Sequence, residues 1–359
     1  MDDLPTFGVE EEFLLVDPRT GEPVHRNSAV AATAEQRGVD LQLELAGCQV
    51  ETTSSVVATS AQLGDELTAL RRVASQAAEA NGVQLLALGL PPTTPHSFPV
   101  TGTPRYQRIG EDYGMIAHEQ GICGCHVHVQ VPDRAAAIHA SNWLRPWLPA
   151  LLALSANSAL YRNADTGHAS WRSVLWQRWP AAGAPPFFTS PEEYDRTADM
   201  LVDTGVILDR KMIYWDVRPS SNFPTVEVRV ADVPATVAEA VLLATLIRAA
   251  VMTARDAPAQ HDLPPGALRA AYWKAAHDGL AGQSLDVLHG RAVPAHEHLR
   301  ALVWRVRPAL DRLGEYDRVA TELDRVATHG NGAMRQLKAW RKRGQVLDAI
   351  AEAAAATLS

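Results

Sequence analysis

The feature that most constrains the fold is a pair of extended segments that lie close together in the sequence. Residues 212–217 and 225–230 are rich in aromatic and β-branched side chains, and only Arg-Pro-Ser-Ser-Asn-Phe-Pro separates them, which predicts a hairpin-like connection. Further strands are predicted at residues 6–16, 41–53, 83–88 and 124–131. Strands paired nearby in sequence, with helices inserted between them, indicate an α+β fold rather than an alternating parallel sheet.

Helices are predicted at residues 61–81, 133–159 and 237–255, and the second should bend near its two prolines. From about residue 266 onward, helices are expected to dominate. A length of 359 residues allows one large domain or two ordinary ones. Because the chain has no internal repeat, long linker or low-complexity block, we expect one domain over residues 1–359 with a helical C-terminal part.

Charge and composition exclude some classes of partner. The formal net charge is -8, so the surface does not attract nucleic acid or anionic membrane in bulk, and cations would have to mediate the approach of an anionic substrate. Three cysteines are a poor disulfide framework and indicate a reducing cytoplasm. The N-terminus lacks the features of a signal peptide. The longest apolar run, residues 240–252, is interrupted by Arg248 and is too short to span a bilayer.

A run of three acids lies in the first predicted strand. Alternation along the strand puts Glu10 and Glu12 on one face, roughly 7 Å apart, and turns Glu11 toward its apolar neighbours. Two carboxylates on one face repel each other unless a cation lies there, and hard divalent cations such as magnesium take oxygen ligands. A solvated strand face is the alternative, and it applies equally to Glu44 and Glu51 in the segment LQLELAGCQVETTS.

A His-x-His pair lies in the strand predicted at residues 124–131. His126 and His128 share one face, while valines occupy the opposite side, which should pack on a core. Such a pair is a moderately specific metal signature, and a structural pair of hydrogen-bonded histidines is the alternative. Cys123 and Cys125 are expected to pack as small hydrophobes.

Each hairpin strand places an acid and an arginine two residues apart on one face. Asp216 precedes Arg218 in the first strand, and Glu227 precedes Arg229 in the second. A structural ion-pair ladder across strands is a common explanation. However, the valines on the other face of the second strand indicate that Glu227 and Arg229 are partly sequestered, where unpaired charges are costly.

The loop Ala169-Ser170-Trp171-Arg172, with Arg178 after it, offers guanidinium forks that suit carboxylate or phosphate. The alternative is that Trp and Arg in this loop form a cation–π pair at the surface. The chain contains no GxxxxGK[ST] loop, no GxGxxG after a strand and no GxSxG elbow. If a nucleotide binds, we therefore expect metals and arginines to hold its phosphates.

Taken in chain order, these segments resemble the type 2 glutamate–cysteine ligase family, also called carboxylate–amine ligases. The resemblance spans almost the whole chain and rests on FGVEEEFLLVDP, QVETTS, GCHVHVQVPD, ASWRSVLWQRWP, YWDVRPSSNFPTVEVRVADVP, AYWKAAHDGLAG and THGNGAMRQL. It implies a catalytic core similar to that of glutamine synthetase, in which an antiparallel sheet forms a half-funnel that holds ATP and divalent metals, with helices packed outside.

The resemblance also implies roles for individual residues. One magnesium ion would be held by Glu12, Glu44 and Glu51, and a second, bridging to the ATP phosphates, by Glu10, His126 and Glu227. Arg229 would meet the transferring phosphoryl group or the substrate carboxylate, and Arg218 would help to bind the nucleotide. Arg172 would contact a substrate anion or a phosphate.

The implied reaction joins the side-chain carboxylate of glutamate to the amine of cysteine through an acyl phosphate, with release of ADP and phosphate. The expected partners are ATP and small amino acids, without nucleic acid or membrane, and a homo-oligomer is compatible with the sequence. One alternative is a metal-dependent, amidohydrolase-like hydrolase that uses the His126–His128 strand. Another is a non-catalytic binding protein with a decayed ligase fold, although the acidic positions are retained.

Overall fold

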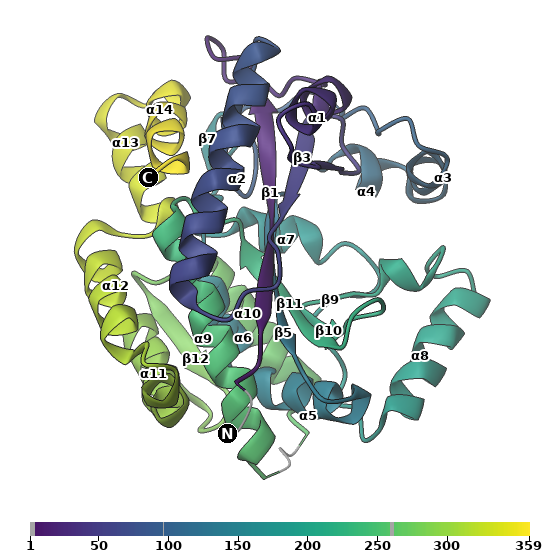
Figure 1. Cartoon of the computed structure of the whole chain (residues 1–359), viewed down its shortest axis with the longest axis vertical. Coiled ribbons are helices and arrows are strands. Elements are labelled where there is room, and N and C mark those ends of the chain that lie inside the picture. Colours follow the sequence, from purple (N-terminus) through teal and green to yellow (C-terminus); the bar gives the residue numbers. More distant parts are fainter. Residues whose placement is uncertain (1–3, 96, 259–261) are drawn as a thin grey trace.

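The computed structural model describes residues 4–95, 97–258 and 262–359 (Figure 1). Residues 1–3, at the start of the N-terminal segment that lacks the features of a signal peptide, lie outside the described residues. At the centre is a seven-stranded antiparallel sheet in the order β10-β11-β5-β1-β3-β2, with β4 also paired to β1. Its strands are β1 (Phe7–Val16), β2 (Gln42–Leu43), β3 (Gln49–Thr53), β4 (Gln84–Leu86), β5 (Gly124–Gln130), β10 (Val217–Pro219) and β11 (Thr225–Asp232).

Helices occupy most of the remaining chain. In the first two thirds they are α1 (Asn27–Glu35), α2 (Ser60–Ala80), α3 (Pro104–Tyr113), α4 (Met115–His118), α5 (Arg134–Leu144), α6 (Leu148–Ser155), α7 (Trp171–Trp176), α8 (Pro191–Asp203) and the 3-10 turn η1 (Arg210–Met212). The last third contains α9 (Val237–Asp256), α10 (Pro265–Asp278), α11 (Ala295–Leu313), α12 (Tyr316–His329), α13 (Gly332–Arg343) and α14 (Val346–Thr357).

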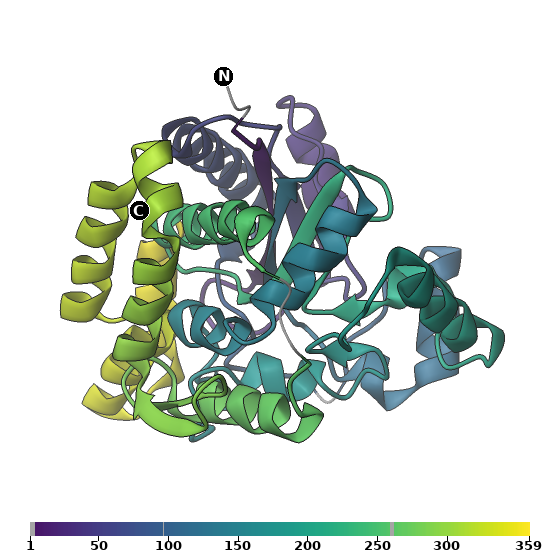
Figure 2. The ribbon, with the colours of Figure 1, turned by 90° about the horizontal axis from the view of Figure 1, so that it is seen from below.

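One face of the sheet is apolar and covered by helices. Val9, Val127 and Val228 point to this face from three neighbouring strands, and each is at most 1% exposed. They belong to one apolar cluster with residues of α5, α6 and α9. Figures 1 and 2 show the C-terminal helices α11 and α12 as an outer layer against α9. The opposite face of the sheet is thereby left for polar side chains.

Glu11 lies on this covered face, as the alternation of the strand predicts. Its carboxylate accepts hydrogen bonds from Arg71 of α2, at 2.5 Å from Nη2 and 3.0 Å from Nε, and both side chains are fully buried. The remaining Arg71 donors bind the backbone carbonyls of Pro234, Ala235 and Thr357. This pair therefore ties β1 to α2 and to the end of the chain.

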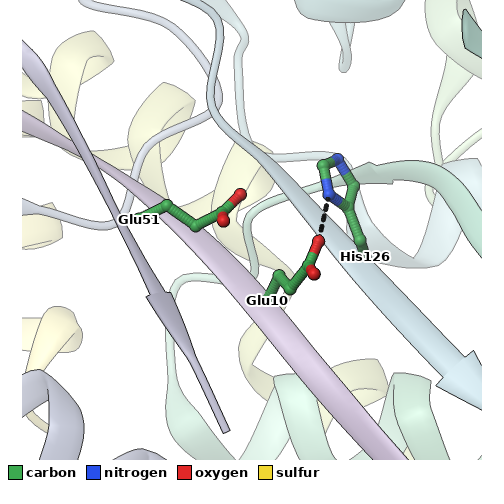
Figure 3. A group of neighbouring side chains, drawn as sticks. All are labelled: Glu10, Glu51 and His126. Atoms are coloured by element: carbon green, nitrogen blue, oxygen red, sulfur yellow. Dashed lines mark hydrogen bonds and ion pairs between the residues drawn. The ribbon is translucent and has the colours of Figure 1, made fainter. Parts of the chain in front are cut away.

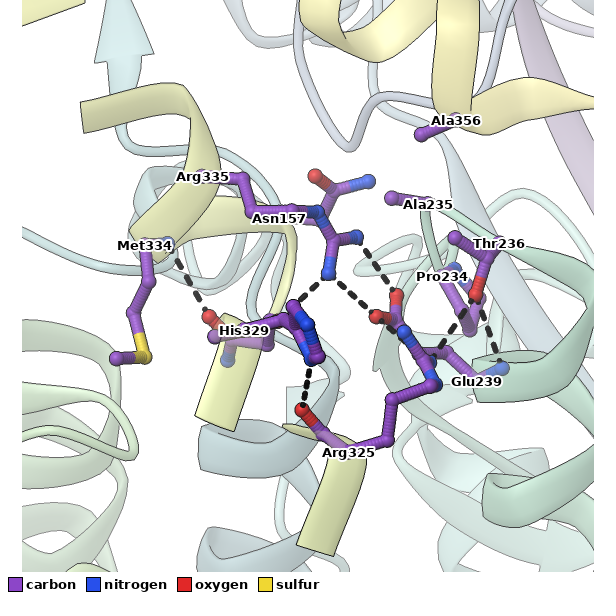
Figure 4. Close-up of polar contacts among 12 residues, drawn as sticks. Asn157, Pro234, Ala235, Thr236, Glu239, Arg325, His329, Met334, Arg335 and Ala356 are labelled. Atoms are coloured by element: carbon purple, nitrogen blue, oxygen red, sulfur yellow. Dashed lines mark hydrogen bonds and ion pairs between the residues drawn. The ribbon is translucent and has the colours of Figure 1, made fainter. Parts of the chain in front are cut away.

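A second buried carboxylate joins the C-terminal helices to α9. Glu239, which is 7% exposed, accepts hydrogen bonds from Arg335 of α13 at 2.7 Å and from Arg325 of α12 at 3.2 Å (Figure 4). Arg335 also donates to the carbonyl of Gly330, between the two helices. Because one acid holds two arginines, the turn between α12 and α13 is fixed against the N-terminal end of α9.

Helix α9 is the one described helix that is long and apolar enough to cross a membrane by length and composition. It has 20 residues, one more than predicted, and its apolar window extends beyond the run 240–252 that was expected to be too short to span a bilayer. However, 89% of its most apolar window is buried inside the protein, as expected of a core helix.

Four predicted elements differ from the structure. The strand predicted at 212–217 is interrupted, with β9 (Tyr214–Trp215) paired in parallel to β8 (Ala182–Gly183) and β10 starting at Val217. The segment 41–53 is split by a turn into β2 and β3, and the predicted helix 133–159 is broken into α5 and α6. The segment 169–172, predicted as a loop, runs into α7, whose first residue is Trp171. The helical C-terminal part includes a hairpin of β12 (Gln283–Asp286) and β13 (Arg291–Pro294), and the short pair β6 (Leu160–Tyr161) and β7 (Ala164–Asp165) was not predicted.

Candidate active site

The strand register brings the predicted site residues to one face of the sheet. Glu10 lies opposite His126, Glu12 lies opposite Glu51, and Glu227 lies opposite His128. Directly paired residues of antiparallel strands point to the same side. A cavity of about 450 Å³ opens on that side, and its lining includes every predicted site residue: Glu10, Glu12, Glu44, Glu51, His126, Arg172, Arg218, Glu227 and Arg229.

Three groups of side chains in this cavity bring their potential ligand atoms within 4.8 Å of one another. The first group is the predicted set of Glu12, Glu44 and Glu51. The second consists of Glu10, Glu51 and His126, in which His126 Nδ1 lies 3.1 Å from Glu10 Oε2 (Figure 3). The third consists of Glu10, His128 and Glu227. The predicted set of Glu10, His126 and Glu227 is thus divided between two groups that share Glu10.

The acids of this cluster repel one another. Burial and the neighbouring charge of Glu12 raise the pKa of Glu44 to about 8, against a smaller opposing effect of Arg229. Burial and the charge of Glu44 hold the pKa of Glu51 well above its usual value. Glu10 differs, because hydrogen bonds from His126 and His128 outweigh its burial and lower its pKa. Carboxylates held together against their repulsion, with imidazoles beside them, are a ligand set that fits divalent cations.

Glu227 faces two arginines next to the acid cluster. Arg218 Nε lies 2.8 Å from Glu227 Oε2, and Arg229 donates through Nη1 to the other carboxylate oxygen. Burial would raise the pKa of Glu227, but Arg229 and Arg218 outweigh it and hold the pKa well below its usual value. The Nε of Arg229 is buried without a hydrogen-bond partner among the described residues. Arg218 and Arg229 therefore place positive charge directly beside the acid cluster.

Arg172 enters the cavity from α7, which contacts β11. Its side chain is 3% exposed, its Nη1 lies 3.7 Å from Asp232 Oδ1, and its Nε has no hydrogen-bond partner among the described residues. A Cβ atom at position 124 would collide with the Arg172 guanidinium. Gly124 therefore provides the space in which this guanidinium lies over β5.

Some candidate residues from the sequence lie elsewhere. Asp216 is buried outside the cavity lining, and burial raises its pKa to about 6 against the effect of Arg172. Arg178 forms an ion pair with Glu119, at 2.7 Å between Nη1 and Oε2. Cys123 and Cys125 are fully buried, and burial raises the pKa of both thiols, in keeping with packing as small hydrophobes.

The sequence analysis missed much of the cavity wall. Beyond the acid cluster the wall is formed by Arg105, Tyr106, Gln120, Trp176, Trp179, Lys211 and Tyr214, which come from α3, η1 and irregular segments as well as from α7 and β9. Trp176 and Tyr214 pack with ring centroids 4.7 Å apart. A smaller cavity of about 250 Å³ adjoins the third ligand group, because it shares Glu10 and His128, and Phe223 lines it. No periodic pattern marks these positions, so only the fold identifies them.

Comparisons with known proteins assign the family. The model of glutamate–cysteine ligase family 2 matches residues 6–353. Two relatives with provisional glutamate–cysteine ligase names are each 62% identical: one from Mycolicibacterium smegmatis covers 100% of both chains, and one from Mycolicibacterium vanbaalenii covers 100% of this chain and 99% of its own.

Solved structures share the fold at low sequence identity. A glutamate–cysteine ligase of Francisella tularensis, in complex with AMP, has a TM-score of 0.72 at 14% identity over 99% of this chain and 89% of its own. A bifunctional glutathione synthetase of Pasteurella multocida has a TM-score of 0.75 at 16% identity and covers 99% of this chain, which spans 52% of that protein. The predicted α+β fold with an antiparallel sheet is confirmed, and nothing supports the hydrolase alternative. The chain belongs to glutamate–cysteine ligase family 2, a family of carboxylate–amine ligases.

Proposed function

We propose that this protein is an ATP-dependent, magnesium-requiring ligase that joins the side-chain carboxylate of glutamate to the amine of cysteine, in the cytoplasm and as one catalytic domain. The observation that carries the proposal is the cavity in which five glutamates lie with Arg172, Arg218 and Arg229 on one side of the sheet. A carboxylate substrate and a nucleoside triphosphate are both anions and repel each other. A cavity that combines arginines with carboxylates able to bind cations would hold both.

The acid cluster would bind magnesium. Glu12, Glu44 and Glu51 would hold one ion. Glu10 would hold a second, either with His126 and Glu51 or with His128 and Glu227. When bound, these ions would offset the negative charge of the phosphates and of the attacking carboxylate. A cation beside Glu44 would also keep that carboxylate ionised at neutral pH, where its raised pKa favours the acid form.

The arginines would orient the reacting groups. Glu227 accepts from Arg218 and Arg229, so it restricts the positions of both guanidinium groups. Arg229 would stabilise negative charge on the transferring phosphoryl group, and Arg172 would bind a substrate anion or a phosphate. The glutamate carboxylate would attack the γ-phosphorus to give an acyl phosphate and ADP, and the amine of cysteine would then displace phosphate.

The smaller cavity beside Glu10 and His128 fits the nucleotide base. It is adjacent to the proposed metal ligands, its lining includes apolar side chains, and the Phe223 ring offers a stacking surface. A ligase of the same fold was solved in complex with AMP, in keeping with nucleotide use by this fold. Phe223→Ala should raise the KM for ATP without changing the KM for amino acids, as measured by phosphate release.

A phosphate-release assay tests the proposal directly. Purified protein is incubated with ATP, magnesium, glutamate and cysteine, and with mixtures that each omit one component. We expect ADP and phosphate only when magnesium, ATP and the carboxylate substrate are all present. Release of AMP and pyrophosphate would contradict the acyl-phosphate mechanism, because it indicates adenylation. A screen of other amino acids and amines in the same assay identifies any better substrate pair.

A further inference from the structure

Asp232, the last residue of β11, lies on the cavity side of the sheet because of an irregularity in that strand. Val228 pairs with Val127 and Ala231 pairs with Cys125, so three residues of β11 advance while β5 advances by two. Regular alternation from Glu227 would put Ala231 on the cavity side and Asp232 in the core. The extra residue reverses this order and brings Asp232 opposite Gly124, on the same side as His126.

The Asp232 carboxylate is fully buried and has donors on both oxygens. Oδ2 accepts from the backbone N–H of Asn157 at 2.8 Å and from the Ser158 hydroxyl at 2.7 Å. Oδ1 accepts from the Ser170 hydroxyl at 2.8 Å and faces Arg172 Nη1 at 3.7 Å. Burial raises the pKa of Asp232, while Arg172 and these hydrogen bonds oppose the rise. The carboxylate thus joins three segments of the chain.

These contacts define where α7 begins and therefore where Arg172 lies. Ser170 is the N-cap of α7 and accepts from the backbone N–H of Ser173, while Ser158 accepts from the backbone N–H of Arg172. Both hydroxyl groups donate to Asp232, so each serine is oriented by the same carboxylate. Since α7 has only six residues, displacement of its first turn would move the Arg172 guanidinium.

The C-terminal helices support this arrangement from behind. Gln336 of α13 donates to the Asn157 side chain at 2.7 Å, and the Asn157 amide donates to the carbonyl of Val233, directly after Asp232. Gly332 lies so close to Asn157 that a Cβ atom would not fit.

We propose that Asp232 is the positioning residue of Arg172: it fixes the guanidinium at the cavity through direct attraction and through the two serine caps. The proposal rests on the proposed function, in which Arg172 binds a substrate anion or a phosphate. Asp232 itself does not line the cavity, so it acts on the reaction through Arg172. A merely structural Asp232 would stabilise the fold without affecting that anion contact.

A double-mutant cycle distinguishes these roles. Asp232→Asn, Arg172→Met and the double variant are compared by kcat/KM per folded molecule, with Glu239→Gln as the matched loss of a buried acid outside the cavity. We expect Asp232→Asn and Arg172→Met each to lower kcat/KM by about 30-fold or more. The kcat/KM of the double variant should lie within about threefold of that of the less active single variant, because the effects of coupled sites are not additive. Effects that multiply, or an Asp232→Asn variant as active as Glu239→Gln, would overturn the proposal.

A binding measurement without turnover separates this proposal from the proposed function. The shift of melting temperature by inorganic pyrophosphate and magnesium is measured for the same four variants and the wild type. We expect a shift in wild type and in Glu239→Gln, and a much smaller shift in Asp232→Asn and Arg172→Met. Wild-type protein that binds pyrophosphate but releases no phosphate from ATP would refute only the proposed function. A full shift in Asp232→Asn, or none in wild type, would refute the role of Asp232.

Discussion

The three consecutive glutamates of β1 should respond to the same substitution in opposite ways. Glu11 and Arg71 form a hydrogen-bonded ion pair in which both side chains are fully buried. Replacing Glu11 by glutamine removes the charge but keeps the shape, and leaves the guanidinium of Arg71 without its counter-ion. On the other face, Glu12 adds to the repulsion among the clustered acids, so its replacement by glutamine relieves repulsion, whereas the Glu10 carboxylate is stabilised by hydrogen bonds from His126 and His128.

The magnitude for Glu11 follows from its partners. Removing one member of a buried pair costs about 3–5 kcal/mol, and we take about 3 kcal/mol because Arg71 keeps three backbone carbonyls as acceptors. An unfolding entropy of about 2.1 cal/mol/K per residue over 359 residues converts this loss to a fall of about 4 °C in melting temperature. Turnover per folded molecule should stay within about threefold of wild type, since the pair does not reach the cavity.

The matched variants reverse that pattern. Glu12→Gln should keep or raise the melting temperature in the absence of magnesium. Both Glu10→Gln and Glu12→Gln should lower turnover by about two orders of magnitude, or roughly 2.7 kcal/mol of transition-state stabilisation. Two measurements are made on all three variants: thermal unfolding in the absence of magnesium, and phosphate release in its presence. A Glu11→Gln protein as stable as wild type, or a fully active Glu12→Gln protein, would refute the division of roles between the two faces.

Three further predictions concern the cavity and the thiols. Glu227→Gln and Arg229→Lys should each lower turnover per folded molecule by about two orders of magnitude, because Arg229 needs its planar fork and Glu227 positions it. Glu227→Gln should also lower the melting temperature, since it leaves Arg218 and Arg229 without their counter-ion, whereas full activity per folded molecule in both variants would instead indicate an ion-pair ladder. The pKa of Glu44 is raised from 4.5 to about 8 in the folded state, so the metal-free protein should lose stability as the pH rises through this window, while stabilisation by magnesium should increase. Melting curves with magnesium and with EDTA between about pH 5 and pH 8 measure both trends. A magnesium effect that does not change with pH would contradict them. Cys123→Ser and Cys125→Ser should retain turnover within about an order of magnitude, because the proposed reaction has no thiol step, and abolished turnover in a folded variant would indicate a thiolate role.

Alternation along strands made the central part of the site predictable from the sequence. A period of two residues separates Glu10 and Glu12 from Glu11, and puts Glu227 and Arg229 on one face, and each of these assignments matches the structure. The apolar face was equally predictable, because valines alternate with these polar residues. The polar face and the apolar face could both be predicted because side chains alternate between the two faces of any regular strand, whatever the strand packs against.

Positions that depend on a break in regular structure could not be predicted in this way. Glu44 and Glu51 are seven residues apart, so one continuous strand would put them on opposite faces; the turn between β2 and β3 brings both to the cavity. Similarly, the extra residue of β11 moves Asp232 to the cavity side, and Arg172 depends on the unpredicted helix α7. A single inserted residue reverses the side to which every later residue points, and no propensity in the sequence marks where it occurs.

The two faces of the sheet also explain how a cluster of acids persists in a folded protein. Glu10, His126 and Glu227 each follow or precede a fully buried valine on the same strand, so the backbone that carries the charges is held by the apolar face behind it. Because the packed strands cannot move apart without losing that packing, only rotation of the side chains can separate the carboxylates, and the backbone positions of these residues stay fixed before any cation binds. Magnesium would then bind to a site whose geometry is already set, and its binding free energy would appear mainly as reduced repulsion between the acids rather than as ordering of the sheet.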